Sequence, residues 1–484
     1  MTKKLLSTYN QLPLPVKAGI WFTICNFIQK GISFITIPVF TRIMTTEEYG
    51  LYSIYLSWYN FLTIIGTLHL SYYVFDKGLV KYENDKEEFV ISIQSLSAVL
   101  TLGLVIIYFS LKTWLDPLIQ IPTAMMICML VQIFFEPPVL YWTARKRFEY
   151  RYYAVLIVTL AIAVLNPALG ILLIKLHYFD NATLARVISV SLISVVSGIG
   201  LGAVIISRAK LLFSIKYWAY ALNFNLPLVP HFLSTTVLVS SDKIMIGDMI
   251  GKSEAGIYSV AYSVGVVLTL LSQSTHHAIL PWLYKKIKVN DYTDIAKIFS
   301  FLLFGIMMII ALLIAFAPDI VYIVGSSKYA DAIWVVPPIC GSVFYIFLRD
   351  LFANIEYYFE KTKLISAASV GVAALNISLN YIFIKKYGYY AAGYTTLFCY
   401  FLLAIVHFCV MRHICVTNGI NVRVFVNTKV ISILSIIVFI IIGGMLFIYH
   451  FAFLRYLIIF SILLFLLINY KRFYRIVSLT HNNK

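Results

Sequence analysis

Long apolar runs separated by short polar breaks occupy almost the whole chain. A membrane-spanning helix needs about 20 apolar residues, and runs of this length recur wherever charge, proline or glycine does not intervene. The runs are continuous, as expected when each segment must satisfy its own backbone hydrogen bonds in lipid. We therefore predict an all-α polytopic membrane protein with about 14 transmembrane helices, at residues 17–41, 52–75, 89–111, 119–142, 153–176, 183–207, 219–241, 257–283, 298–317, 332–355, 364–384, 390–411, 429–449 and 454–470.

Composition and charge agree with this prediction. Of 484 residues, 61% are hydrophobic and only 12% are charged, which excludes an ordinary soluble domain. The net charge of +17 does not indicate nucleic acid, because basic residues gather on alternate loops at about three to one. That bias predicts that both termini lie in the cytoplasm, and it places Arg349 with the cytoplasmic residues.

A short motif occurs twice. Glu48–Ser53 reads EYGLYS and Glu254–Ser259 reads EAGIYS, and the two copies start 206 residues apart. Each follows a long apolar run that ends in charge, and its Glu and Gly suit a turn from which the next helix starts. Six predicted spans separate the copies, so the repeat is parallel. We predict a six-helix N-lobe (1–213), a six-helix C-lobe (214–425), and two further helices with a cytoplasmic tail (426–484).

Lys30 is the leading candidate for function. It lies near the middle of the first predicted span, where a charge costs about 2.5–3.5 kcal/mol and usually faces a water-filled cavity. Asn26, four residues earlier, shares its helix face. Both are candidates for binding an anionic substrate; a structural lysine neutralised by a carboxylate is the alternative.

Two further cations occupy equivalent places near the ends of spans 1 and 7. Arg42 and Lys243 are candidates for binding phosphate oxygens, which arginine can do with two hydrogen bonds. The alternative is local pairing, of Arg42 with Glu47 or Glu48 and of Lys243 with Asp242.

Arg186 and Arg145 complete the predicted substrate-binding set. Arg186 lies just inside span 6, either as a cavity cation or as an interfacial anchor. Arg145 belongs to a basic cluster at the end of span 4, which either gathers an anionic head group or serves only topology.

Carboxylates in or beside the spans raise the question of ion coupling. Glu136 precedes Pro137 and Pro138, which we expect to break span 4 and free backbone carbonyls. Asp242 lies at the end of span 7. Both are ion-coupling candidates, and the alternative for each is a helix-end charge or salt bridge. No metal site is predicted, since neither the histidines nor the six cysteines have a convergent spacing.

Two strings carry a family resemblance: PVFTRIMTTEEYGLYS (Pro38–Ser53) and SDKIMIGDMIGKSEAGIYSVAYSVG (Ser241–Gly265). They resemble the polysaccharide-export, O-antigen (Wzx-like) flippases of the multidrug/oligosaccharidyl-lipid/polysaccharide (MOP) superfamily, whose fold is MATE-like. The resemblance implies an inner-membrane protein that moves an undecaprenyl-diphosphate-linked oligosaccharide to the outer leaflet by alternating access. It further implies no cofactor, coupling to a Na+ or H+ gradient, contact with membrane lipids, and a polysaccharide polymerase and chain-length regulator as candidate partners.

Three other interpretations remain. A multidrug or cation antiporter of the MATE-like branch should have carboxylates, not lysine, in the middle of its spans. An integral-membrane polysaccharide polymerase should have a large outer loop, and the predicted outer segments Asp242–Gly256 and Asp319–Asp331 are short. A scaffold would leave Lys30 without an explanation. The sequence therefore favours a transporter over an enzyme.

Overall fold

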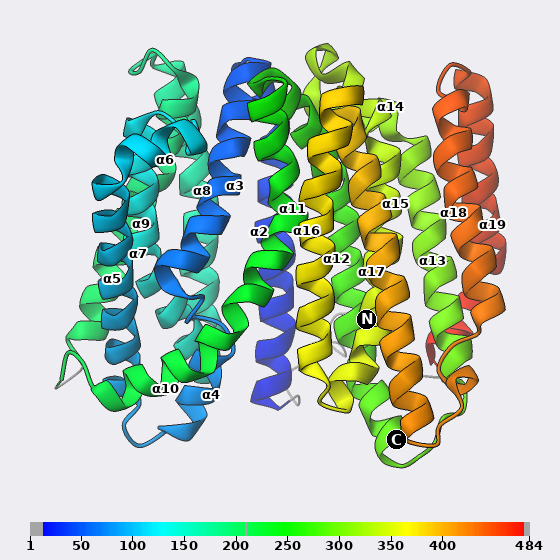
Figure 1. Cartoon of the computed structure of the whole chain (residues 1–484), viewed down its shortest axis with the longest axis horizontal. Helices are drawn as coiled ribbons and strands as arrows, with labels where there is room; N and C mark the ends of the chain where they lie inside the picture. Colours follow the sequence, from blue (N-terminus) through cyan, green and yellow to red (C-terminus); the bar gives the residue numbers. More distant parts are fainter. Residues whose placement is uncertain (1–12, 209–210, 479–484) are drawn as a thin grey trace, which may run out of the picture. The chain divides into compact units, whose positions relative to one another are not determined.

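The computed structural model describes residues 13–208 and 211–478. The regular secondary structure in these residues is helical. The chain divides into two compact units, Met1–Thr236 (unit 1) and Val237–Lys484 (unit 2), and the boundary falls inside one helix. The predicted division at 213 and 425 groups the spans by sequence repeat and stays a prediction. Figure 1 shows the helices of each unit.

The described part of unit 1 contains eight helices before the connecting segment. They are α2 (Leu14–Ile43), α3 (Thr46–Thr67), α4 (Val74–Lys81), α5 (Lys86–Ser110), α6 (Lys112–Ile119), α7 (Thr123–Phe148), α8 (Tyr152–Lys175) and α9 (Ala182–Ile206). α10 (Ile215–Asn225) packs across α4 and α5 and continues through η1 (Leu226–Leu228) into α11 (Val229–Met249). α7 packs closely along α9, where a Cβ on Gly198 would lie 2.1 Å from the carbonyl oxygen of Phe135.

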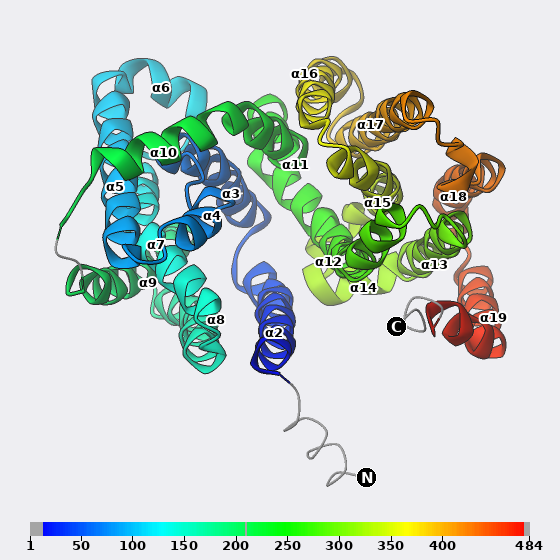
Figure 2. The ribbon, with the colours of Figure 1, turned by 90° about the horizontal axis from the view of Figure 1, so that it is seen from below.

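Unit 2 is built around a buried central helix. Its elements are α12 (Lys252–Lys288), α13 (Ile295–Ala315), α14 (Ala317–Gly325), η2 (Ser327–Trp334), α15 (Val336–Tyr358), α16 (Thr362–Tyr387), α17 (Tyr390–Thr417), η3 (Val422–Val424), α18 (Thr428–Ile448) and α19 (Ala452–Ser478). α15 packs against α12, α13, α17 and α18, and Figure 2 shows these helices around it.

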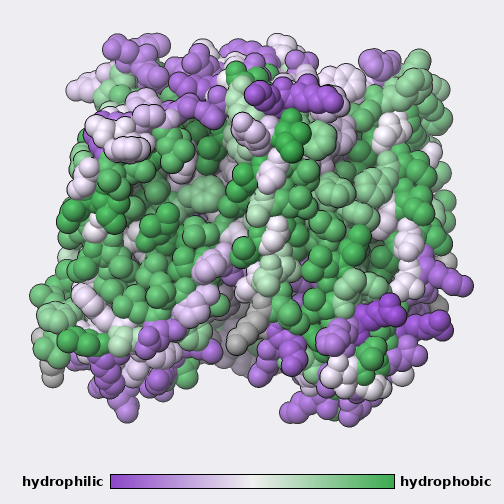
Figure 3. Space-filling view, in the orientation of Figure 1, coloured by the Kyte–Doolittle hydropathy of each residue, from purple (hydrophilic) through white to green (hydrophobic). Residues whose placement is uncertain are grey.

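Thirteen helical segments of the described chain are long and apolar enough to cross a membrane, so the protein is a multi-pass membrane protein. We predicted about 14 spans, and the predicted span at 52–75 is the one that does not appear among these thirteen segments. Its place is taken by α3, which has two glutamates in its first turn and ends at Thr67. A turn with positive φ at Leu68, His69 and Tyr73 then interrupts the expected helix. On the face shown in Figure 3, hydrophobic residues cover the middle of each unit and hydrophilic residues gather toward the helix ends.

The first copy of the repeated motif forms a helix start, as predicted. Thr45 and Glu48 make a capping box, with the Thr45 backbone N–H donating to Glu48 Oε2 (2.8 Å) and the Glu48 N–H to Thr45 Oγ1 (3.1 Å). The other oxygen of Glu48 accepts from the backbone N–H of Ala182 at 3.0 Å. Glu48 thus joins the start of α3 to the start of α9, with both oxygens engaged in structural hydrogen bonds.

Candidate functional site

Lys30 lies on a polar stripe of α2. Thr23, Asn26, Lys30 and Ser33 follow helical spacing on one side of the helix, and all four are exposed. The opposite side packs against α8, where Cys25 Sγ lies 3.1 Å from Thr159 Oγ1. The stripe therefore does not face its own bundle.

The predicted alternative for Lys30 was neutralisation by a carboxylate. Within the described part of unit 1, no carboxylate forms an ion pair with Lys30. A lysine in the middle of a membrane helix, beside an exposed amide and two hydroxyls, is suited to a water-filled surface that attracts anions.

Arg42 and Lys243 have different surroundings despite their equivalent places in the repeat. Arg42 is exposed at the end of α2, and its Nη1 donates to the Pro38 carbonyl at 2.8 Å. Lys243 is half-buried on α11, with Nζ 4.4 Å from the centre of the Tyr262 ring. The structure thus gives Lys243 an aromatic support.

Arg186 is a buried cation of unit 1. Its guanidinium donates to the Asn166 carbonyl at 3.0 Å and to the Asn166 side-chain oxygen, and it lies 4.5 Å from the Phe40 ring and 5.3 Å from the Tyr52 ring. Only 8% of the residue is exposed. These contacts join α2, α3, α8 and α9, which an exposed interfacial anchor would not do.

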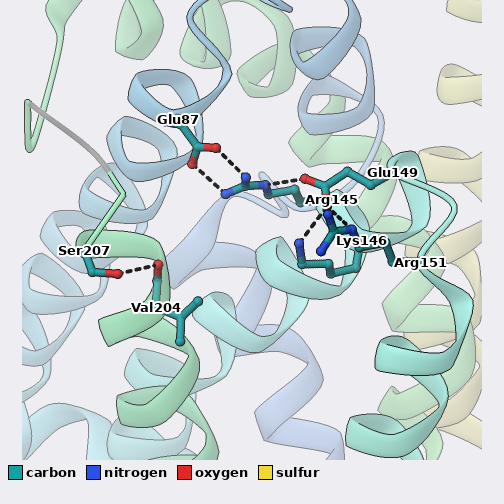
Figure 4. Close-up of polar contacts among 7 residues, drawn as sticks. All are labelled: Glu87, Arg145, Lys146, Glu149, Arg151, Val204 and Ser207. Atoms are coloured by element: carbon teal, nitrogen blue, oxygen red, sulfur yellow. Dashed lines mark hydrogen bonds and ion pairs between the residues drawn. The ribbon is translucent and has the colours of Figure 1, made fainter.

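Arg145 lies in an ion-pair cluster between α5 and α7 (Figure 4). Its guanidinium contacts both carboxylate oxygens of Glu87, one at 2.6 Å, and Nε donates to Glu149 at 2.9 Å. Lys146 donates to the other oxygen of Glu149 at 2.6 Å. With three of its donors on carboxylates, Arg145 fastens the end of α7 to the start of α5.

The cluster holds Glu149 in its charged form. Burial alone would raise the pKa of Glu149, but hydrogen bonds from Lys146 and Arg145 outweigh it and hold this pKa below its usual range. The local charge is therefore largely balanced within the protein.

Asp242 is the centre of a buried polar network in unit 2. The carboxylate is completely buried and accepts from the Tyr258 hydroxyl (2.5 Å), Asn380 Nδ2 (2.7 Å) and the Thr396 hydroxyl (2.8 Å). The donors come from α12, α16 and α17. Asn376 extends the network, accepting from Asn380 and donating to Thr396, both at 3.3 Å. Asp242 is thus a buried anion held by neutral donors, not a helix-end charge.

Glu136 has fewer partners. It is half-buried on α7, and its Oε2 is enclosed without a hydrogen-bond partner in the described chain. The expected break at Pro137 and Pro138 was wrong, since α7 runs continuously through both prolines. Packing along α9 holds the helix together, although the two missing N–H groups still leave carbonyls of the preceding turn unpaired within the helix.

The sequence interpretation missed the asparagines around Asp242 and misplaced Arg349. Asn376 and Asn380 are four residues apart in an apolar span, a signal that could have found them. Arg349 lies inside α15, nine residues before its end, rather than with the cytoplasmic loops. It pairs with Asp350 at 2.9 Å, and both side chains are 20% exposed.

The histidines do not form a metal centre. His276 Nε2 lies 2.7 Å from Asn354 Oδ1, and no group of three His, Cys, Asp or Glu residues that could hold a metal ion occurs among the residues described. The polar groups around Asp242 are hydroxyl, amide and carboxylate oxygens, which fit an alkali cation or a proton better than a transition metal.

Comparison with known proteins identifies similar sequences. A family model described as polysaccharide biosynthesis protein matches residues 16–287, more than half of the chain. An Lsg locus protein of Haemophilus influenzae is 29% identical over 161 residues, which cover 31% of this chain and 38% of that protein. The match therefore spans well under half of that relative's length.

Solved structures show the fold. The lipid II flippase MurJ in an inward closed conformation superposes with a TM-score of 0.68 and 16% identity, covering 94% of this chain and 99% of that chain. An inward-facing multidrug resistance MATE family transporter of the MOP superfamily gives a TM-score of 0.56 and 13% identity, covering 82% and 97%. A MOP superfamily transporter from Pyrococcus furiosus gives 0.56 and 14%, covering 82% and 95%. The fold is thus that of the MOP superfamily, as predicted.

Proposed function

The chain belongs to the polysaccharide biosynthesis protein family, and we propose that it is a flippase for an undecaprenyl-diphosphate-linked oligosaccharide. It moves a repeat unit of O-antigen, capsule or exopolysaccharide from the cytoplasmic to the outer leaflet of the bacterial inner membrane. It is a transporter and not an enzyme, in keeping with its fold.

The observation that carries the proposal is the exposed polar stripe around Lys30. A diphosphate and a hydrophilic glycan must cross the hydrocarbon region while the lipid tail stays within it. A helix that faced lipid along its whole length would not retain a central lysine, an amide and two hydroxyls at this cost. Lys30 is the cation we assign to the diphosphate, and Asn26 is assigned to the adjoining sugar or phosphate oxygens.

Each unit has a further cation that can bind an anion. Arg42 in unit 1, and Lys243 and Arg349 in unit 2, are each at least partly exposed. Arginine and lysine bind phosphate oxygens with charge-assisted hydrogen bonds. Alternating access then presents the cations of each unit first to one leaflet and next to the other.

Energy for export comes from a Na+ or H+ gradient, for which Asp242 is the leading site. A fully buried carboxylate without a charged hydrogen-bond donor is unfavourable unless a proton or cation neutralises it. Tyr258, Thr396 and Asn380 have hydroxyl and amide oxygens beside it that can hold such an ion. Glu136, with its unpaired oxygen, is the second candidate.

The experiment that tests the function is genetic. Deletion of the gene should remove surface polysaccharide and cause the lipid-linked oligosaccharide to accumulate on the cytoplasmic side. Lys30→Ala should reproduce this loss at a normal protein level, and Lys30→Arg should restore part of the export because it keeps the charge. Lys175→Ala, at the exposed end of α8, is the matched control and should export normally. Normal polysaccharide in the Lys30→Ala strain would rule out the role of this residue.

The antiporter alternative makes a different prediction. If the substrate were cationic, removal of Lys30 should improve binding rather than abolish transport, because a repelling charge is lost. Drug efflux by cells that carry the Lys30→Ala protein distinguishes the two functions.

A further inference from the structure

A buried carboxylate–imidazole pair in unit 2 has no part in the function proposed above. Glu356 lies on α15, two residues before its end, and His407 lies on α17. Glu356 Oε1 and His407 Nδ1 are 2.8 Å apart, and both side chains are 0% exposed. Two titratable groups are thus sealed together in the interior of a helix bundle.

The free atoms of this pair leave room for a proton. Glu356 Oε2 and His407 Nε2 are both buried without a hydrogen-bond partner in the described chain. With a single proton in the contact, the pair has a net charge of −1. A second proton makes it neutral, either as imidazolium and carboxylate or as imidazole and carboxylic acid. Burial disfavours net charge, so a proton or an approaching cation can balance the one-proton form.

Arg349 is a largely buried cation that interacts with the pair. It lies on the same helix seven residues before Glu356, which is about 10 Å along the axis, and it interacts electrostatically with Glu356 as well as with Asp350. Arg349 and Asp350 balance each other. The one-proton form of the Glu356–His407 pair therefore makes this region negative, whereas the two-proton form leaves it neutral.

Several other titratable groups on the packed helices are engaged or uncharged. On α12, His276 contacts Asn354 and Lys286 contacts Asp291. Tyr284 on α12 packs edge-on against Tyr358. Tyr400 and Cys415 on α17 carry no charge near neutral pH, and the buried residues of α13 are apolar. Arg412 and His413 on α17 and Lys285 on α12 are exposed, whereas the side chain of Arg349 is only 20% exposed. Solvent therefore screens the charge of Arg349 less than theirs, so Arg349 responds most to the charge of the pair.

We propose that Glu356 and His407 form a proton-binding site that controls how strongly Arg349 binds an anionic diphosphate group. The proposal rests on the flippase function in so far as it takes a diphosphate as the ligand of Arg349. Protonation of the pair removes a negative charge near Arg349. Proton binding therefore strengthens diphosphate binding by Arg349, and diphosphate binding strengthens proton binding. An exporter that exchanges its substrate for an entering proton needs proton binding to weaken substrate binding, which is the opposite effect. The pair therefore regulates affinity, and the exchange site remains at Asp242.

The first test detects the proton directly. Infrared spectra of the purified full-length protein, titrated with acid, should show a carboxylic-acid band that is absent from Glu356→Gln and whose midpoint shifts in His407→Gln. Identical titrations in all three proteins would overturn the proton site. His407→Gln provides a second variant in case Glu356→Gln does not fold.

The second test measures the linkage, with inorganic pyrophosphate as the probe. For the wild type, acidification through the titration of the pair should strengthen binding by up to about tenfold per pH unit, the limit for one linked proton. Glu356→Gln should remove this dependence, and Glu149→Gln, in the ion-pair cluster of unit 1, should retain it. Pyrophosphate itself takes up protons in acid, but this affects the wild type and the variants equally when they are compared at the same pH.

The outcomes separate this proposal from the function. Equal pH dependence in wild type and Glu356→Gln, or no pyrophosphate binding by the wild type at any pH, overturns the link to Arg349. Neither result alters the Lys30→Ala export experiment, which tests the flippase function on its own.

Discussion

The tyrosine shared by the two copies of the motif contacts a buried ionisable group in each unit, and the two groups are of opposite kind, one basic and one acidic. In unit 1 the guanidinium of Arg186 lies against Tyr52, and in unit 2 the carboxylate of Asp242 accepts a hydrogen bond from Tyr258. The two tyrosines are the same residue of the repeated motif, 206 residues apart. Thr396, and not Asp242, takes the place of Arg186 in the repeat, so the same tyrosine contacts groups from different positions in the two units.

The amide partners correspond as well. Asn166 accepts from Arg186 in unit 1, and Asn376 contacts Thr396 in unit 2; both pairs of positions are related by 210 residues. Arginine stays protonated at all physiological pH values, so the charge of unit 1 is permanent. A buried carboxylate depends on a proton or cation. If Asp242 is the coupling site as proposed, ion-dependent change should belong to unit 2, and unit 1 should not sense the ion.

The largest expected effect comes from removing the charge of unit 2. Asp242→Asn keeps the shape but loses charged hydrogen bonds of about 1.5–3 kcal/mol each, so ion affinity and ion-driven export should fall about 10- to 100-fold. Arg186→Met should instead lower stability by about 1–3 kcal/mol, because Asn166 loses its donor, and keep ion dependence. Export under imposed Na+ and H+ gradients measures both. Loss of ion dependence in Arg186→Met would break the comparison.

Thermal unfolding sharpens the same comparison and identifies the ion. A cation that binds only the folded protein should stabilise it by about 2.7 kcal/mol at 100 times its dissociation constant. Either Na+ or acidification should raise the unfolding temperature of the wild type and of Arg186→Met more than that of Asp242→Asn, in which the Glu356–His407 pair can still take up a proton. Potassium is the control salt. If no ion distinguishes wild type from Asp242→Asn, Asp242 is not the coupling site.

Apolar runs predicted most of this fold because a membrane requires each span to be long and continuously apolar. The exception is informative. Between Thr46 and Tyr73 the tyrosines and the tryptophan count as hydrophobic, so the apolar run extends to residue 75. In the structure the helix ends at Thr67, and a turn follows it. Periodicity alone does not show where such a helix ends.

The site could be predicted only where a single residue violates the pattern. Lys30 is visible because it is a charge within an apolar run. The partners of Asp242 lie 138 and 154 residues away, at Asn380 and Thr396, so their meeting depends on tertiary packing. The burial of Arg186 likewise depends on helices that only the fold brings together.

The smallest expected effect lies at the ends of α7 and α15, which repeat the same turn. Arg151 N–H donates to the Lys146 carbonyl at 2.9 Å, as Lys361 N–H does to that of Glu356 at 3.0 Å. At the end of α7, Glu149 forms ion pairs with Arg145 and Lys146. At the end of α15, Glu356 is instead buried against His407. The end of α7 should therefore contribute a little to the stability of the fold and nothing to the pH dependence of pyrophosphate binding.

Glu149→Gln tests that contrast. Because the pKa of Glu149 is held below its usual range, its charge stabilises the fold fully above about pH 4.3, the ordinary value. This stabilisation disappears as the pH falls through the lowered pKa. The variant should lose about 1 kcal/mol or less at neutral pH, as partly exposed ion pairs do, and match the wild type in acid. Unfolding temperatures across this pH range measure the gap. A gap that persists in acid would mean that Glu149 acts through packing, and the two helix ends would then differ in shape rather than in charge.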